Sequence, residues 1–122
     1  MTQEDKDLLL KDLCARLPYR VKCYLVDLNC VKVIGSIQYL GTNQPSVDVF
    51  DEDDNEYETL YMTELKPYLL PLSSMTEEQK IELTCIIDSD YAQIDWYNKN
   101  HFDYRGLIPK GLAIDATGLN IY

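Results

Sequence analysis

The first eighteen residues carry the pattern of an amphipathic helix. Apolar side chains recur at spacings of three and four and form one stripe, made of Leu9, Leu10, Leu13, Cys14 and Leu17. Thr2 can cap this helix through its hydroxyl, and Glu4 and Asp5 place negative charge beside the positive end of the helix dipole. Pro18 cannot continue a helix, so we expect the helix to end there and an extended segment to follow.

Beyond Pro18 the pattern changes from helical to alternating, which predicts strands. Four strand-like runs occupy residues 20–26, 30–40, 46–50 and 57–62. Gly35 lies in the middle of the second run, at a position where strands bulge or bend. The third and fourth runs flank a polar stretch and predict a β-hairpin. Residues 63–72 add a strand that Pro67 and Pro71 confine to a sheet edge or a crossing position.

Two short helices are predicted in the C-terminal half. Overlapping capping boxes start at Ser74 and Thr76, so we expect a helix there with Ile81 and Cys85 facing inward. Residues 94–100 predict the second helix. Both helices are too short to be stable by themselves and must depend on packing against the rest of the domain.

Residues 101–114 combine glycines and a proline with large apolar side chains, which is typical of a packed irregular segment. We expect Trp96 and Phe102 to be buried in this part of the protein. Residues 116–122 follow as a loose tail, because terminal segments are poorly ordered unless something holds them.

These elements predict one α+β domain, and 122 residues suffice for a single core. The expected divisions are a helix at 1–18, a small bent antiparallel sheet at 19–72, a helical and irregular segment at 73–115, and the tail at 116–122. Five strands of this length with a glycine bend can curl into a small SH3-like barrel.

The polar stretch of the hairpin is the most unusual feature of the sequence. From residue 48 to residue 64 the chain has eight acidic residues and no Lys, Arg or His: Asp48, Asp51, Glu52, Asp53, Asp54, Glu56, Glu58 and Glu64. The start of this stretch is similar to a calcium loop, but an EF-hand requires Gly at the sixth place and Glu at the twelfth, where this chain has Glu56 and Met62. The cluster is therefore either a solvated hairpin tip or a contact surface.

The formal net charge of −10 restricts the possible partners. Affinity for phosphate groups comes from Lys and Arg, so the charge argues against direct nucleic-acid binding and against anionic membrane surfaces. A partner that is attracted electrostatically should be basic. The sequence also shows no signal-peptide pattern and no apolar run of membrane-spanning length, which leads us to expect a cytoplasmic protein.

The sequence gives little support for catalysis, a metal or a cofactor. The four cysteines, Cys14, Cys23, Cys30 and Cys85, are widely spaced, so we expect free, metal-free thiols. His101 stands close to Asp103 and Arg105, but no nucleophile motif, second histidine or phosphate-binding glycine loop accompanies it. We therefore predict a protein that is not an enzyme and has no cofactor, in which His101 has a structural role.

Several segments resemble small uncharacterised proteins of phages and mobile elements of gut bacteria. They are MTQEDKDLLLKDLCARLPY at residues 1–19, KPYL at 66–69, SSMTEE at 73–78 and DWYNKNHFDYRGLI at 95–108. The resemblance implies a phage or mobile-element setting inside a bacterial host and supplies no activity or site residues. Residues 22–61, which contain most of the acidic stretch, match nothing in that group.

Three functions remain open. The first is a non-enzymatic interaction protein, such as an inhibitor or adaptor, whose acidic hairpin (Asp48, Asp51, Glu52, Asp53, Asp54, Glu56 and Glu58) binds a basic surface of a host or phage protein. The alternative is a protein that binds a small ligand, a nucleotide or second messenger, near Tyr104, Arg105 and His101. The third is a small hydrolase using His101 with a carboxylate. The oligomeric state stays open as well.

Overall fold

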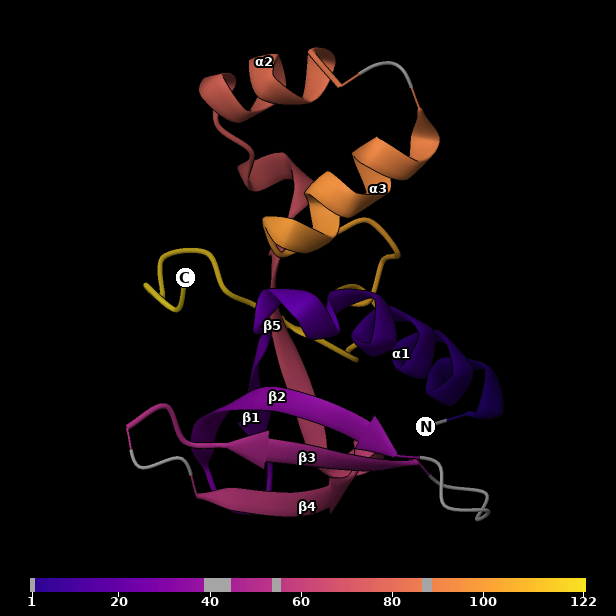
Figure 1. Cartoon of the computed structure of the whole chain (residues 1–122), viewed down its shortest axis with the longest axis vertical. Coiled ribbons are helices and arrows are strands. Elements are labelled where there is room, and N and C mark those ends of the chain that lie inside the picture. The colour runs from indigo at the N-terminus through magenta and orange to yellow at the C-terminus, as the bar shows by residue number, and fades with distance from the viewer. Residues whose placement is uncertain (1, 39–44, 54–55, 87–88) are drawn as a thin grey trace.

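The computed structural model describes residues 2–38, 45–53, 56–86 and 89–122 (Figure 1). Three helices and seven strands follow one another in the order α1 (Gln3–Arg16), β1 (Lys22–Leu25), β2 (Cys30–Gln38), β3 (Ser46–Phe50), β4 (Tyr57–Tyr61), β5 (Leu65–Pro71), α2 (Glu77–Thr84), α3 (Asp90–Lys99), β6 (Phe102–Asp103) and β7 (Ile114–Asp115). Short 3₁₀ turns lie at Leu17–Tyr19, Met62–Glu64 and Leu72–Ser74. The α+β class predicted from the sequence is confirmed, and no described helix combines the length and apolar character needed to cross a bilayer.

The sheet is mixed and open, which corrects two expectations. Its strands lie in the order β4-β3-β2-β1-β5-β6, and β7 also pairs with β5. The pairs from β4 to β5 are antiparallel, but β6 and β7 are parallel to β5. Among the described residues, β4 and β6 lie at opposite ends of the order, so the sheet does not close into a barrel.

Strand β5 joins the two parts of the sheet. Its first residues pair with β1, whereas Tyr68 to Pro71 extend beyond β1 and pair with β7 and β6. The strand crosses between the two parts of the sheet, as one of the two predicted positions required, and each proline pairs with one strand: Pro67 with β1 and Pro71 with β6. The prolines are accommodated because β5 changes neighbours along its length and neither proline has to donate to a continuous ladder.

Gly35 forms the predicted bulge in β2. The pairing register with β3 shifts between Ile34 and Ser36, and Val33 and Ile34 are both buried in succession. A Cβ atom at position 35 would lie 3.2 Å from Cδ1 of Phe50, so the close approach of the two strands favours glycine. The bulge increases the local twist and helps to bend the sheet around α1.

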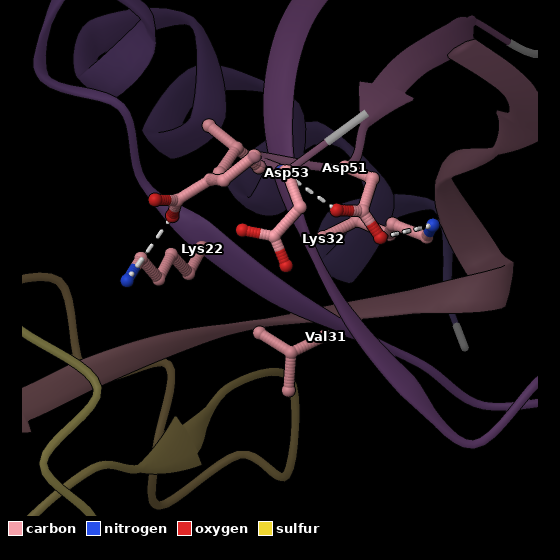
Figure 2. Close-up of a pocket in the computed structure, with 7 residues that line it drawn as sticks. Lys22, Val31, Lys32, Asp51 and Asp53 are labelled. Carbon is pink, nitrogen blue, oxygen red and sulfur yellow. Dashed lines mark hydrogen bonds and ion pairs between the residues drawn. The ribbon is translucent and has the colours of Figure 1, made fainter. Parts of the chain in front are cut away.

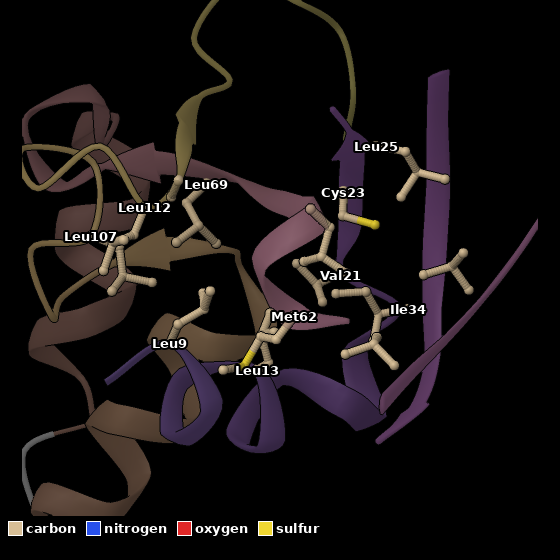
Figure 3. Packing of buried hydrophobic residues seen from close by; sticks show 14 residues of the cluster. Leu9, Leu13, Val21, Cys23, Leu25, Ile34, Met62, Leu69, Leu107 and Leu112 are labelled. Atoms are coloured by element: carbon tan, nitrogen blue, oxygen red, sulfur yellow. The ribbon is translucent and has the colours of Figure 1, made fainter. Parts of the chain in front are cut away.

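The core lies between α1 and one face of this bent sheet (Figure 3). Strict alternation in β1 and β3 directs Cys23, Leu25, Val47 and Val49 inward. The helix contributes Leu9 and Leu13, as its apolar stripe predicted, and the far side is completed by Leu69 of β5 and by Leu107 and Leu112 from the C-terminal segment. The hairpin of β3 and β4 therefore packs on the core through one face, and its other face points away from the core.

Helices α2 and α3 lie together at the end of the molecule opposite to β3 and β4 (Figure 1). The capping box at Thr76 is confirmed, with Gln79 as its partner, and Ser89 caps α3. No residue of α2 is buried: Ile81 is 63% exposed and Cys85 is exposed, so the predicted inward face was wrong. Trp96 Nε1 of α3 donates to the Glu82 carboxylate of α2 at 3.1 Å. Trp96 and Phe102 are buried, as predicted, and their rings stack.

The segment expected to be a loose tail is docked. The Tyr122 hydroxyl donates to the Tyr68 carbonyl at 2.8 Å and accepts from the Lys22 amide at 2.9 Å. The Tyr122 ring stacks on His101, and Ala116 is buried. These contacts join the end of the described chain to β1 and β5, which explains why the segment does not behave as its composition suggested.

Candidate functional site

The acidic stretch lies on the hairpin of β3 and β4, as predicted. The two strands pair in a regular register from Ser46 with Tyr61 to Phe50 with Tyr57, and the Asp51 amide donates to the Glu56 carbonyl at the tip. Val47 and Val49 anchor the hairpin in the core. Because side chains alternate along a strand, Asp48 and the outer side chains of β4 point to the opposite face.

Asp48 holds the hairpin together and is a poor candidate for binding a partner. Its carboxylate accepts hydrogen bonds from the Ser36, Gln38 and Thr59 side chains at 3.0, 3.2 and 2.7 Å. These donors belong to β2 and β4, the two neighbours of β3, so the carboxylate links three adjacent strands. Glu64 has a similar role, because its carboxylate accepts from the Tyr61 amide at 2.8 Å.

Two lysines fold against the tip and neutralise part of its charge (Figure 2). Lys22 Nζ lies 3.1 Å from Glu52, and Lys32 Nζ lies 3.2 Å from Asp51. The hydrogen bond to Asp51 is the main reason that the pKa of Lys32 is raised, and burial opposes it. Together with Val31, Val33 and Asp53 these residues line a surface hollow of about 260 Å³. Sequence reasoning missed both lysines, because they lie on β1 and β2 and only the pairing of these strands with each other and with β3 brings them to the tip.

The tip still has more negative than positive charge. We use the name acidic tip for the five described carboxylates that remain after Asp48 and Glu64 are set aside: Asp51, Glu52, Asp53, Glu56 and Glu58. They face two ammonium groups, so the described part of the tip has three more negative than positive charges. Asp53 and Glu56 are exposed and Glu58 is half-buried. Asp54 lies outside the described residues.

Two exposed tyrosines lie beside the acidic tip on β4. Tyr57 is 67% exposed and Tyr61 51% exposed, and the Tyr57 ring lies 5.6 Å from that of Phe50 between centroids. A second hollow, of about 310 Å³, runs along Ser46, Thr59, Leu60, Tyr61 and Glu64. Large aromatic side chains exposed next to charged groups are typical of contact surfaces. The sequence contains ten tyrosines and two phenylalanines, a composition that suits the rim of a core or a contact surface, but composition does not show which tyrosines are exposed.

A second polar cluster is buried at the end of α1, and the sequence did not reveal it. Arg16 and Asp12 have no exposed side-chain surface, and two hydrogen bonds of 2.8 and 3.1 Å join them. Arg16 also donates to the Phe102 carbonyl at 2.6 Å. Arg105 Nε lies 3.3 Å from the same Asp12 carboxylate as an ion pair without hydrogen-bond geometry. The i, i+4 spacing of an Asp and an Arg is common on solvated helices, so nothing in the sequence marks this pair as buried.

The three residues of the alternative ligand site have contacts within the fold. Arg105 donates to the Tyr104 hydroxyl at 2.8 Å and packs over the Tyr104 ring, in addition to its ion pair with Asp12. Tyr104 stacks on Tyr97. Neither of the two hollows described above includes His101, Tyr104 or Arg105. The small-ligand alternative therefore stays a prediction without a described cavity to support it.

His101 is held in an environment that disfavours its charged form. Burial is the main cause that lowers its pKa to about 4, and the positive charges of Arg16 and Lys22 add to the effect. Its ring packs on Tyr122, and its Nδ1 atom has no hydrogen-bond partner among the described residues. General-base catalysis would require a pKa closer to neutral and an orienting carboxylate, so the geometry favours the structural role.

The four cysteines form no disulfide. Burial raises the pKa of the Cys23 thiol to about 12, which disfavours the reactive thiolate at that position. Within the described ranges, no group of three or more His, Cys, Asp or Glu side chains is arranged to hold a metal ion. Comparison of the chain with protein-family models, curated proteins and solved structures found no significant match.

Proposed function

We propose that this is a non-enzymatic interaction protein that binds a basic surface of another protein through its acidic tip. The observation that supports the proposal most directly is the separation of roles within the acidic stretch. Asp48 accepts hydrogen bonds from β2 and β4, and Glu64 accepts one from the Tyr61 amide, whereas the tip carries five described carboxylates beside the ammonium groups of Lys22 and Lys32. Mutual repulsion among these carboxylates costs stability, and a basic partner would relieve it.

The structural position of the tip suits such a contact. The hairpin is anchored in the core through Val47 and Val49, so its outer face is presented on a rigid support. The exposed rings of Tyr57 and Tyr61 lie beside the charges and offer apolar area that ion pairs alone lack. Electrostatic attraction would then set the rate of association, and the tyrosines would contribute to its lifetime.

The resemblance of several segments to proteins of phages and mobile elements suggests the setting. We propose that the partner is a protein of the bacterial host or of the phage itself and that the two meet in the host cytoplasm. Inhibition or adaptation of host machinery is a function that needs neither a cofactor nor a catalytic group. This part of the proposal rests on analogy with the group that the sequence resembles.

Capture from bacterial lysate with two variants of equal charge tests the proposal. The tip variant is Asp53→Asn/Glu56→Gln/Glu58→Gln, and the control variant is Asp27→Asn/Glu77→Gln/Glu78→Gln, which removes the same number of charges elsewhere. We expect the wild-type protein and the control to capture the same basic protein at low salt, and the tip variant to lose it. Capture should weaken as salt rises, since the Debye length falls from about 30 Å at 0.01 M to about 8 Å at 0.15 M.

The result that would refute the proposal is equally clear. If the tip variant captured the same proteins as the wild-type chain at every salt concentration, the acidic tip would have no role in binding. If the control lost capture to the same extent as the tip variant, the net charge of the whole chain and not the hairpin would be responsible.

A further inference from the structure

Strand β4 has one edge that no described residue pairs with. It stands at the end of the strand order, and β3 is its neighbour on the other side. No described strand lies beyond this edge, and in Figure 1 the helices lie on the other side of β3. An unpaired strand edge presents amide and carbonyl groups in a fixed array, which is the arrangement that takes up an additional strand in β-augmentation.

The register shows which backbone groups face outward. The hydrogen bond from the Asp51 amide to the Glu56 carbonyl marks these two residues as a hydrogen-bonded pair of the antiparallel ladder. Such pairs alternate along the ladder, so Glu58 and Leu60 bond to β3 opposite Val49 and Val47. The amide and carbonyl groups of Tyr57, Thr59 and Tyr61 therefore point away from β3, toward the open edge.

An independent contact agrees with this assignment and sets the limit of the free edge. The Tyr61 amide donates to the Glu64 carboxylate at 2.8 Å, which requires that it points away from β3. Glu64 therefore caps one end of the edge, and a Met62–Glu64 turn follows directly. Tyr57 and Thr59 are left with outward amides, which is a short pairing site with one defined end.

We propose that β4 takes up an extended, lysine- or arginine-rich segment of the partner as an additional strand, paired with the outward groups of Tyr57 and Thr59. The inference rests on the proposed function and names the form in which the basic surface is bound. Charge complementarity selects the occupant, because Asp53 lies in the loop before the strand, Glu56 directly precedes it and Glu58 is its second residue. The same charges oppose pairing with a second copy of this acidic chain.

The side chains beside the edge fit such a segment. Tyr57, Thr59 and Tyr61 share the exposed face of β4, so alternate side chains of an added strand would lie against the two tyrosine rings. Arginine and lysine side chains can pack on aromatic rings while their charged ends reach the carboxylates. The hollow next to Thr59, Tyr61 and Glu64 offers room for a side chain at the far end.

Amide hydrogen exchange with a synthetic peptide of alternating lysine and threonine tests the pairing directly. In the protein alone the Tyr57 and Thr59 amides should exchange quickly, while the Glu58 and Leu60 amides, bonded to β3, should exchange slowly. Adding the peptide at low salt should slow exchange at Tyr57 and Thr59 by at least about tenfold, because each outward amide gains a carbonyl partner.

A pair of substitutions at one position supports the measurement. Thr59→Pro removes the outward amide and the side-chain bond to Asp48 but no backbone bond to β3, whereas Thr59→Val keeps the amide and loses only that side-chain bond. Peptide affinity should fall by about tenfold in Thr59→Pro and by less than about twofold in Thr59→Val. Thermal unfolding of both variants shows whether the hairpin is intact, and the exchange experiment on the wild-type chain decides the question if Thr59→Pro does not fold.

The outcomes separate this inference from the function on which it rests. If the peptide binds, and binding is lost in Asp53→Asn/Glu56→Gln/Glu58→Gln, but exchange at Tyr57 and Thr59 is unchanged, the edge pairing is wrong and the acidic tip remains the binding surface. If the peptide does not bind at low salt, or binds the tip variant as tightly as the wild-type chain, both proposals fail.

Discussion

Asp12→Ala tests how much the fold depends on the ion pair buried at the end of α1. Asp12 receives two hydrogen bonds from Arg16, and neither side chain has exposed surface. Without Asp12, the Arg16 guanidinium keeps its bond to the Phe102 carbonyl and no described counter-charge. Removing one partner of a buried ion pair costs about 3–5 kcal/mol. The free energy of unfolding of a typical domain is about 5–15 kcal/mol, so this loss would remove a large share of it.

A double substitution separates the cost of the unpaired charge from the value of the pair. Asp12→Leu/Arg16→Met replaces both groups by apolar side chains of similar size. We expect it to lose less stability than Asp12→Ala, because buried ion pairs contribute little compared with well-packed apolar residues. Arg105, which also faces Asp12, retains 18% side-chain exposure and can turn toward water.

Urea unfolding followed by the fluorescence of Trp96 measures both effects, provided that the denaturant slopes agree among the variants. Lys80→Ala, which breaks the exposed pair with Glu77, is the control and should change stability by less than about 0.5 kcal/mol. A loss below about 1 kcal/mol for Asp12→Ala, or equal losses for the single and double variants, would contradict the reasoning.

Two further predictions concern the late aromatic segment. Trp96→Ala should destabilise the protein by about 3–5 kcal/mol in urea unfolding, because the ring is buried and stacks on Phe102, whereas Tyr91→Ala, at an 87% exposed position, should have little effect. Burial lowers the pKa of His101 from 6.5 to about 4. Between these two pH values the unfolded chain binds a proton at His101 and the folded chain does not, so the free energy of unfolding should fall as the pH drops from 6.5 toward 4. His101→Asn, which suits the positive φ of 63° at this position, should remove that part of the pH dependence, and an unchanged profile would refute it.

Features encoded by neighbouring residues could be predicted from the sequence. The capping boxes at Thr2 and Thr76, the hairpin of β3 and β4 and the bulge at Gly35 each depend on a few adjacent residues, and all are present. The buried faces of β1 and β3 follow from simple alternation. For α2 the same reasoning failed, because a helix pattern shows that one face is apolar but not that another element packs against it.

Features that depend on distant partners could not be predicted. Asp48 looked like a contact residue because the donors Ser36 and Gln38 come from another strand, and only the pairing register places them around its carboxylate. The parallel strands β6 and β7 are two residues long and carry no pattern of their own. The lysines at the acidic tip are likewise placed there by the pairing register of β1, β2 and β3.

The bond between Arg16 and the Phe102 carbonyl also bears on the order in which the protein can be assembled. The two residues are 86 positions apart. Strand β5 likewise gains the partners of Tyr68 to Pro71 only after β6 and β7 have been synthesised. During synthesis, α1 is therefore complete long before its buried guanidinium has an acceptor. A chain that has reached only the acidic hairpin already contains β1 to β4, which pack against Leu9 and Leu13, but it lacks the Phe102 carbonyl, so the burial of Arg16 is completed by a late, long-range contact.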